Sequence, residues 1–137
     1  MEPIRARTYA AALLLVVSCS DRRNTEAKKF LGPDHVNGLA EKTVAYYAKN
    51  KRLPPPATAT PAEGSCCGQP RDQCQPNAAS WNVSPWRDIG FKIDKPTYAW
   101  VSLEVTDSGF TARAHGDIDC DTNYSTFEVT GETSAAA

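Results

Sequence analysis

Residues 97–114 read TYAWVSLEVTDSGFTARA, and the alternation of apolar and polar side chains along them determines the fold class. Four apolar residues recur at every second position of the first half: Ala99, Val101, Leu103 and Val105. This period is typical of a strand with one buried face. The segment Thr106-Asp107-Ser108-Gly109 supplies a turn, and the alternation resumes from Phe110 to Ala114. The pattern therefore predicts a β-hairpin with strands at 97–105 and 110–114.

Further strands are predicted on both sides of this hairpin. Ser125 to Thr130 predicts a last strand, with Phe127 and Val129 facing the core. Upstream, Ile89 to Ile93 predicts a short strand. Because consecutive strands joined by short connections pair antiparallel, we expect a meander of three or four strands.

A helical period precedes the strands. Asp34 suits the N-cap of a helix from His35 to Asn50, after Gly32-Pro33 has broken any earlier helix. Its apolar face recurs at steps of three and four residues: Val36, Leu39, Ala40, Thr43, Val44, Tyr46 and Tyr47. The predicted fold class is α+β: one N-terminal helix packed on a three- to four-stranded antiparallel sheet, with a disulfide-stapled loop.

Residues 54–80 predict that loop. They are rich in Pro, Ala, Thr, Gly and Cys and show neither a helical nor a strand period, so we expect a connector ordered by crosslinks. Four cysteines lie in or after it: Cys66, Cys67, Cys74 and Cys120. In an oxidising compartment, this even number predicts two disulfides. A bond between neighbouring Cys66 and Cys67 would close a strained ring, which leaves two pairings. In either, one bridge closes the short loop to Cys74 and the other reaches Cys120. The alternative is a zinc site that uses Cys66, Cys67 and Cys74 with either Cys120 or His115.

The N-terminus predicts export. Arg5 and Arg7 precede an apolar run, Tyr9–Val17, about half of the ~20 residues that span a bilayer as a helix. The run ends in Val16-Val17-Ser18-Cys19, which resembles a bacterial lipobox, so lipid attachment is expected at Cys19. Two alternatives stay open. One is an ordinary cleaved signal with an incidental Cys19, and the other is an uncleaved membrane helix.

An Asp-rich turn separates the last two strands. Oxygen-bearing side chains stand at offsets 1, 3, 5, 7, 9 and 12, the spacing of a calcium loop: Asp117, Asp119, Asp121, Asn123, Ser125 and Glu128. Thr122 occupies the position where such loops need glycine, and Cys120 is expected in a disulfide. Two interpretations stay open: a weak calcium site at Asp117, Asp119 and Asp121, and a solvated acidic turn.

No catalytic residue is predicted. The sequence contains no glycine-rich phosphate loop, serine nucleophile elbow or His-Glu zinc helix, so we expect a non-enzymatic protein with no cofactor other than the calcium considered above. A formal net charge of -1 argues against nucleic-acid binding. His35 and His115 are far apart in the sequence, and a lone histidine on a strand face, such as His115, is expected at the surface. Five aromatic residues are expected to pack the core, with an exposed patch for glycan or protein contact as the alternative: Trp81, Trp86, Tyr98, Trp100 and Tyr124.

Several short motifs, in their order, resemble type IV pilins and pseudopilins. The motifs are Trp86-Arg87-Asp88-Ile89-Gly90-Phe91, then Tyr98 and Trp100, then Phe110-Thr111-Ala112-Arg113-Ala114, Gly116-Asp117-Ile118-Asp119 and Ser125-Thr126-Phe127. They resemble the C-terminal sheet of pilin-like proteins, and the likeness covers about residues 36–131. The chain departs from that family at its N-terminus. It has no glycine before residue 32, and a lipobox stands in place of the prepilin peptidase site. Cys120 also replaces a glycine of the family's Asp-Gly-Asp loop.

The resemblance implies a pilin-like head on a lipid anchor. We expect a signal peptide at 1–18, a lipidated tether at 19–33, a pilin-like globular domain at 34–131 and a disordered tail at 132–137. The expected function is that of a bacterial cell-envelope lipoprotein, a structural or accessory component of a type IV pilus or type II secretion-like system. Ser20, rather than Asp, follows the cysteine. This resembles the enterobacterial pattern that sorts lipoproteins to the outer membrane, so we expect the anchor in that membrane. The alternative is an envelope-anchored binding module that uses an aromatic face or the acidic loop.

Overall fold

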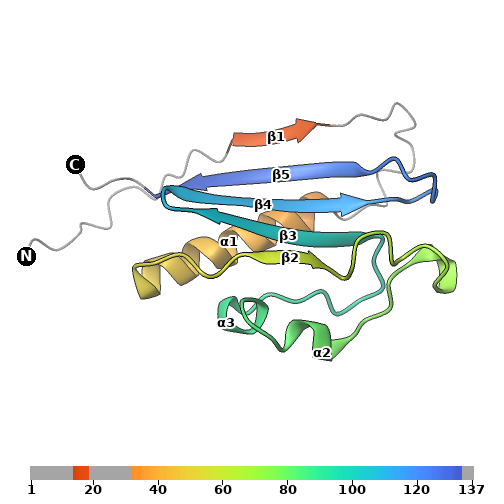
Figure 1. Cartoon of the computed structure of the whole chain (residues 1–137), viewed down its shortest axis with the longest axis horizontal. Coiled ribbons are helices and arrows are strands. Elements are labelled where there is room, and N and C mark those ends of the chain that lie inside the picture. The colour runs from red at the N-terminus through yellow and green to blue at the C-terminus, as the bar shows by residue number, and fades with distance from the viewer. Residues whose placement is uncertain (1–13, 19–31, 134–137) are drawn as a thin grey trace, which may run out of the picture.

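The computed structural model of the chain describes residues 14–18 and 32–133. One long helix lies across one face of a five-stranded antiparallel sheet, and short helices border one edge (Figure 1). The elements are β1 (Leu14–Ser18), α1 (Gly32–Asn50), β2 (Ala57–Thr60), a 3-10 turn (Pro70–Asp72), α2 (Ala78–Trp81), α3 (Trp86–Ile89), β3 (Ala99–Thr106), β4 (Gly109–Gly116) and β5 (Ser125–Glu132). The helix-on-sheet α+β arrangement agrees with the sequence prediction, but the described sheet has five strands rather than three or four.

Strands β3, β4 and β5 form the centre of the sheet. The strand order is β1-β5-β4-β3-β2, and every neighbouring pair is antiparallel. Thr106 pairs with Gly109 across the predicted turn, so the hairpin prediction is confirmed. The prediction for Ser125–Thr130 is confirmed as well, although β5 continues to Glu132.

Helix α1 starts earlier than predicted. It begins at Gly32 rather than His35, because Pro33 falls in the first turn, where a helix needs no N–H donor and the proline φ suits helical geometry. It ends at Asn50, as predicted. Lys51 adopts a left-handed φ of 58° and donates its N–H to the carbonyl of Tyr47 at 2.8 Å, which closes the last turn.

The core lies between α1 and the sheet. The helix buries Val36, Leu39, Ala40 and Thr43, and the Thr43 hydroxyl donates to the Leu39 carbonyl at 2.8 Å. From the strands, alternate residues supply the apolar partners: Val101, Leu103, Phe110, Ala112, Ala114 and Val129. Phe127 packs partly buried against them. The period-two alternation of the sequence therefore matches the buried face.

The predicted strand at Ile89–Ile93 is wrong. Its first residue ends α3, and Gly90 adopts a left-handed φ of 72° that terminates this helix. The N–H of Phe91 donates to the carbonyl of Trp86 at 3.0 Å. The side chains of Ile89, Phe91 and Ile93 are still buried, so the alternation reflects burial without strand pairing.

The strand that pairs with the other side of β3 comes from the connector instead. Residues 54–80 contain β2, which pairs with β3 through a shifted register between Ala57 and Thr60. The sequence Ala-Thr-Ala-Thr lacks large apolar residues, and so it carries no strand signal. β1 adds a fifth strand beside β5 and falls within the predicted signal peptide.

Candidate functional site

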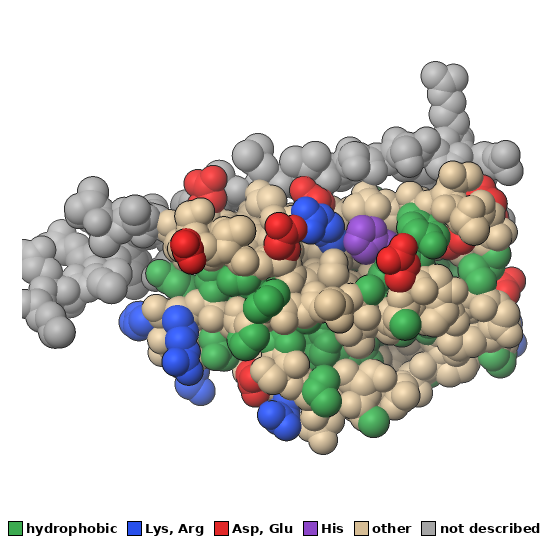
Figure 2. Space-filling view, in the orientation of Figure 1, with side chains coloured by type: hydrophobic (Ala, Val, Ile, Leu, Met, Phe, Trp, Pro, Cys, Tyr) green, Lys and Arg blue, Asp and Glu red, His purple; other side chains and the backbone are tan. Residues whose placement is uncertain are grey.

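The face of the sheet opposite α1 is polar. Acidic, basic and histidine side chains gather over its middle strands (Figure 2). Arg113 on β4 donates from Nε to Glu128 at 2.6 Å and from Nη1 to Glu104 at 2.7 Å. Hydrogen bonds to Glu104 and Glu128 and their negative charges raise the pKa of Arg113 further above its ordinary value. Three neighbouring strands are therefore joined by one guanidinium.

An aromatic cluster lies at one end of this polar face. Trp100 is only 2% exposed and stacks on His115, with ring centroids 6.0 Å apart. Tyr124 meets Trp100 edge-on at 4.9 Å. The Nδ1 atom of His115 lies 2.9 Å from the Thr126 hydroxyl. Burial, and next the positive charge of Arg113, lower the pKa of His115, so the imidazole is neutral at pH 7.

The two disulfides fix the connector over this cluster. Cys66 bonds Cys74 and Cys67 bonds Cys120, which confirms two bridges and selects one of the two predicted pairings. Cys66 and Cys74 pack against Trp100. Because these four cysteines are consumed in disulfides, no thiolate remains among them to bind zinc, and the zinc alternative is wrong.

The acidic loop brings its three aspartates together. One carboxylate oxygen from each of Asp117, Asp119 and Asp121 lies within 4.8 Å of the others. Asp117 is 5% exposed, and its carboxylate accepts the N–H groups of Asp121 and Thr122, both at 3.0 Å. Partial desolvation, a hydrogen bond with Asp121 and that residue's negative charge raise the pKa of Asp119.

The wider calcium-loop spacing is not reproduced in space. Glu128, at the twelfth position, lies on β5 and binds Arg113 instead of the loop. Asn123 donates its N–H to Asp121 at 2.9 Å, and Ser125 begins β5. Three carboxylates thus fit an oxygen-rich cation site, but the six-ligand cage does not form.

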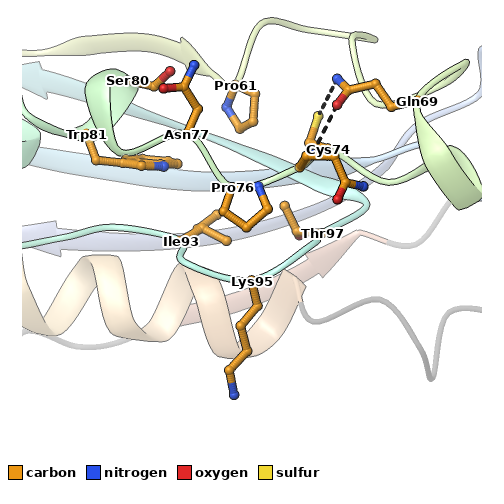
Figure 3. A pocket seen from close by; sticks show the side chains of 11 residues that line it. Pro61, Gln69, Cys74, Pro76, Asn77, Ser80, Trp81, Ile93, Lys95 and Thr97 are labelled. Atoms are coloured by element: carbon orange, nitrogen blue, oxygen red, sulfur yellow. Dashed lines mark hydrogen bonds between the residues drawn. The ribbon is translucent and has the colours of Figure 1, made fainter.

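A small cleft lies between the connector and the segment that leads to β3 (Figure 3). Its volume is about 150 Å³, and its walls include Pro61, Pro76, Trp81 and Thr97. The side chain of Lys95 extends away from the other labelled residues (Figure 3). Small-molecule sites usually measure about 300–1,000 Å³. None of the lining residues is a carboxylate, a histidine or a free thiol, so the cleft offers no acid–base pair.

The tryptophans do not form an exposed aromatic face. Trp81 and Trp86 are buried and meet edge-on at 5.4 Å, and Phe91 packs against both. The Nε1 atom of Trp86 donates to the Thr60 hydroxyl at 3.1 Å. The default prediction of core packing is confirmed for the three tryptophans, while Tyr98 and Tyr124 are partly exposed. An aromatic binding patch built on these tryptophans is therefore wrong.

His115, predicted at the surface, lies on the polar face of the sheet and is partly buried. His35 is partly buried, and its Nε2 lies 3.3 Å from the hydroxyl of Thr97. The N–H and the carbonyl of Thr97 form hydrogen bonds with Cys74, so His35 connects α1 to the stapled connector. Burial lowers the pKa of His35, against the opposing charge of Asp34. Neither the aromatic cluster nor this connection has a sequence signal, because both depend on long-range folding.

No family model, curated protein or solved structure matches this chain. Within residues 14–18 and 32–133, no helix is both long enough and apolar enough to cross a membrane. Cys19, the predicted lipid-attachment residue, lies outside the described residues.

Proposed function

We propose that this protein is a non-enzymatic cell-envelope lipoprotein, anchored through Cys19, whose pilin-like domain is an accessory or structural component of a type IV pilus or type II secretion-like system. The observation that carries the proposal is the order of its elements. One helix leads through a disulfide-stapled connector into an antiparallel meander, and the motifs that resemble pilins lie on α3, β3, β4 and β5.

The positions of these motifs support a shared architecture. Trp86 and Phe91 pack with Trp81 in the core beside α1. The motif at 110–114 supplies the buried residues of β4 that carry side chains, and the aspartate motif forms the loop that Cys120 fixes to the connector. Residues that resemble a family pattern in sequence therefore carry the packing and loop geometry of this domain.

An anchor at Cys19 also suits the position of α1. Residues 20–31 separate Cys19 from the helix, and twelve extended residues span at most about 40 Å. The lipid would therefore hold the domain close to the membrane surface, within reach of an assembly embedded in that membrane. Ser20 after the cysteine resembles the rule for sorting lipoproteins to the outer membrane, and this favours an outer-membrane anchor.

The anchor is tested by the mass of the mature N-terminus and by detergent partitioning. We expect a diacylglycerol-modified Cys19 in the detergent phase. Cys19→Ala should remain unprocessed or appear in the aqueous phase, whereas the matched control Ser20→Ala should stay modified. An unmodified mature N-terminus at another residue would contradict the lipoprotein assignment.

The partner is tested by affinity purification of the lipidated chain from solubilised membranes. We expect pilus or secretion-system subunits to be recovered with the wild-type protein and lost with Cys19→Ala. Recovery of the intact, lipidated protein without any such subunit would contradict the accessory role.

A second candidate is an envelope-anchored module that binds calcium through the acidic loop. The observation in its favour is the convergence of Asp117, Asp119 and Asp121 within 4.8 Å. Isothermal titration with calcium tests it, with Asp119→Ala as the variant that should lose the heat of binding.

A further inference from the structure

The two edges of the sheet are built differently. Among the described strands, β2 and β1 are outermost. Strand β2 has four residues and a register shift, with Pro54-Pro55-Pro56 before it and Pro61 after it. Short length, bulges and prolines are the features that prevent an edge from pairing with another chain. The β2 edge is therefore protected.

Strand β5 has none of these protections. It has eight residues, contains no proline and pairs with β4 in an unbroken register. Between Ser125 and Gly131 the only charged residue is Glu128, and its carboxylate is held by Arg113 at 2.6 Å. Neither a bulge nor an unpaired charge between Ser125 and Gly131 therefore prevents the outer N–H and C=O groups of β5 from pairing with an added strand.

The structure shows what this edge accepts. β1 lies along the outer side of β5 (Figure 1), antiparallel and in register over five residues, from Leu14 opposite Thr130 to Ser18 opposite Thr126. The occupying sequence is Leu-Leu-Val-Val-Ser, which is uncharged and mostly apolar. Residues of an added strand that stand opposite Phe127 and Val129 would share the core side of the sheet, where an apolar residue is favoured.

Processing before Cys19 would remove all of β1. Within residues 32–133, α1, the segment around α2 and α3, and strands β3, β4 and β5 build a shared core. The mature domain would keep α1 and strands β2 to β5, and the outer edge of β5 would lose its pairing with β1. This step rests on the proposed function, because it requires cleavage of the signal peptide.

We propose that the outer edge of β5, residues 126–130, is a strand-addition site that binds an extended, apolar, uncharged segment of a partner protein in antiparallel orientation. Leu14–Ser18 occupies the site in the precursor, and cleavage opens it. Main-chain hydrogen bonds provide binding, and the positions opposite Phe127 and Val129 select apolar residues. The site thus becomes available only after export.

Hydrogen exchange tests this site on the mature chain, residues 19–137, with Cys19→Ser to leave no free thiol. The probe is a synthetic peptide with the sequence of Leu14–Ser18, flanked by lysines for solubility. At ten times its dissociation constant, the peptide should slow exchange of the outward-facing amides in β5 about tenfold. The amides of β2 serve as the internal control and should not change. A peptide with Val16→Pro should give no protection.

Three results would overturn the proposal. The first is no saturable slowing up to about 1 mM peptide, the limit of weak binding. The second is equal protection by the proline peptide. The third is a mature chain that sediments as a dimer with β5 already protected, which would assign the edge to a second copy. An unlipidated mature N-terminus would contradict the proposed anchor, but it would not change the peptide result.

Discussion

Removing the Cys67–Cys120 disulfide should lower the free energy of unfolding by about 4 kcal/mol. The bond joins residues 53 positions apart, so it constrains the unfolded chain much more than Cys66–Cys74, which spans 8 positions. The same chain-entropy relation gives about 2.5 kcal/mol for the shorter loop. Cys67 and Cys120 are partly exposed, so serine at both positions leaves no large cavity and buries no unpaired hydroxyl.

Urea unfolding of the double variant Cys67→Ser/Cys120→Ser measures this difference. The slope against urea should rise, because the unfolded chain becomes less compact, while the midpoint falls. The comparison is the double variant Cys66→Ala/Cys74→Ala. It should lose less stability through chain entropy, but it also loses packing contacts with Trp100. Alkylation of the unreduced wild type should find no free thiol at these four positions. A loss below about 1 kcal/mol for the long bridge, with both serines verified, would refute the chain-entropy argument.

Calcium at 100 times its dissociation constant should stabilise the domain by about 2.7 kcal/mol, and Asp119→Ala should abolish the resulting shift in melting temperature. An unchanged melting temperature of the wild type would show that the acidic loop is only a polar turn. Gly131→Ala should destabilise by about 1–3 kcal/mol in urea unfolding, because a Cβ there overlaps the Phe110 ring. Gly38→Ala should instead stabilise by about 0.5–1 kcal/mol, because a Cβ in this helix would make only an ordinary van der Waals contact with Phe91 at 3.9 Å; the same sign for both variants would contradict the packing. Burial lowers the pKa of both His115 and His35 in the folded chain, so the unfolded chain binds more protons below about pH 6.5 and the free energy of unfolding should fall as the pH drops. His115→Gln should remove only the share of that slope due to His115, and an unchanged slope would contradict the assignment.

The sequence predicted the elements whose burial is periodic. Val101 and Leu103 on β3 and Ala112 on β4 alternate with polar residues because one face of the sheet meets α1 and the other meets solvent. The period-two alternation gave a wrong prediction where buried residues alternate without belonging to a paired strand. Ile89, Phe91 and Ile93 alternate and are buried, yet a left-handed Gly90 interrupts the backbone.

The candidate site was predicted only where the residues are close in sequence. Asp117, Asp119 and Asp121 converge because one loop carries them. Glu128 matched the calcium spacing, but strand pairing places it beside Arg113, a residue 15 positions earlier. The stack of Trp100 on His115 likewise follows from the β3–β4 register. Such contacts depend on register, which spacing along one strand does not specify.

The segment Leu14–Ser18 shows why a short apolar run allows more than one structural interpretation. Periodicity alone does not separate a short buried strand from a helical or signal segment, because all three are continuous apolar stretches. Here the same five residues suit an export signal in sequence and pair with β5 in the structure. The two roles are successive if cleavage follows export, since the precursor covers its own strand edge and the mature domain presents it. The pairing would then limit edge-to-edge aggregation whenever the precursor folds before it is processed.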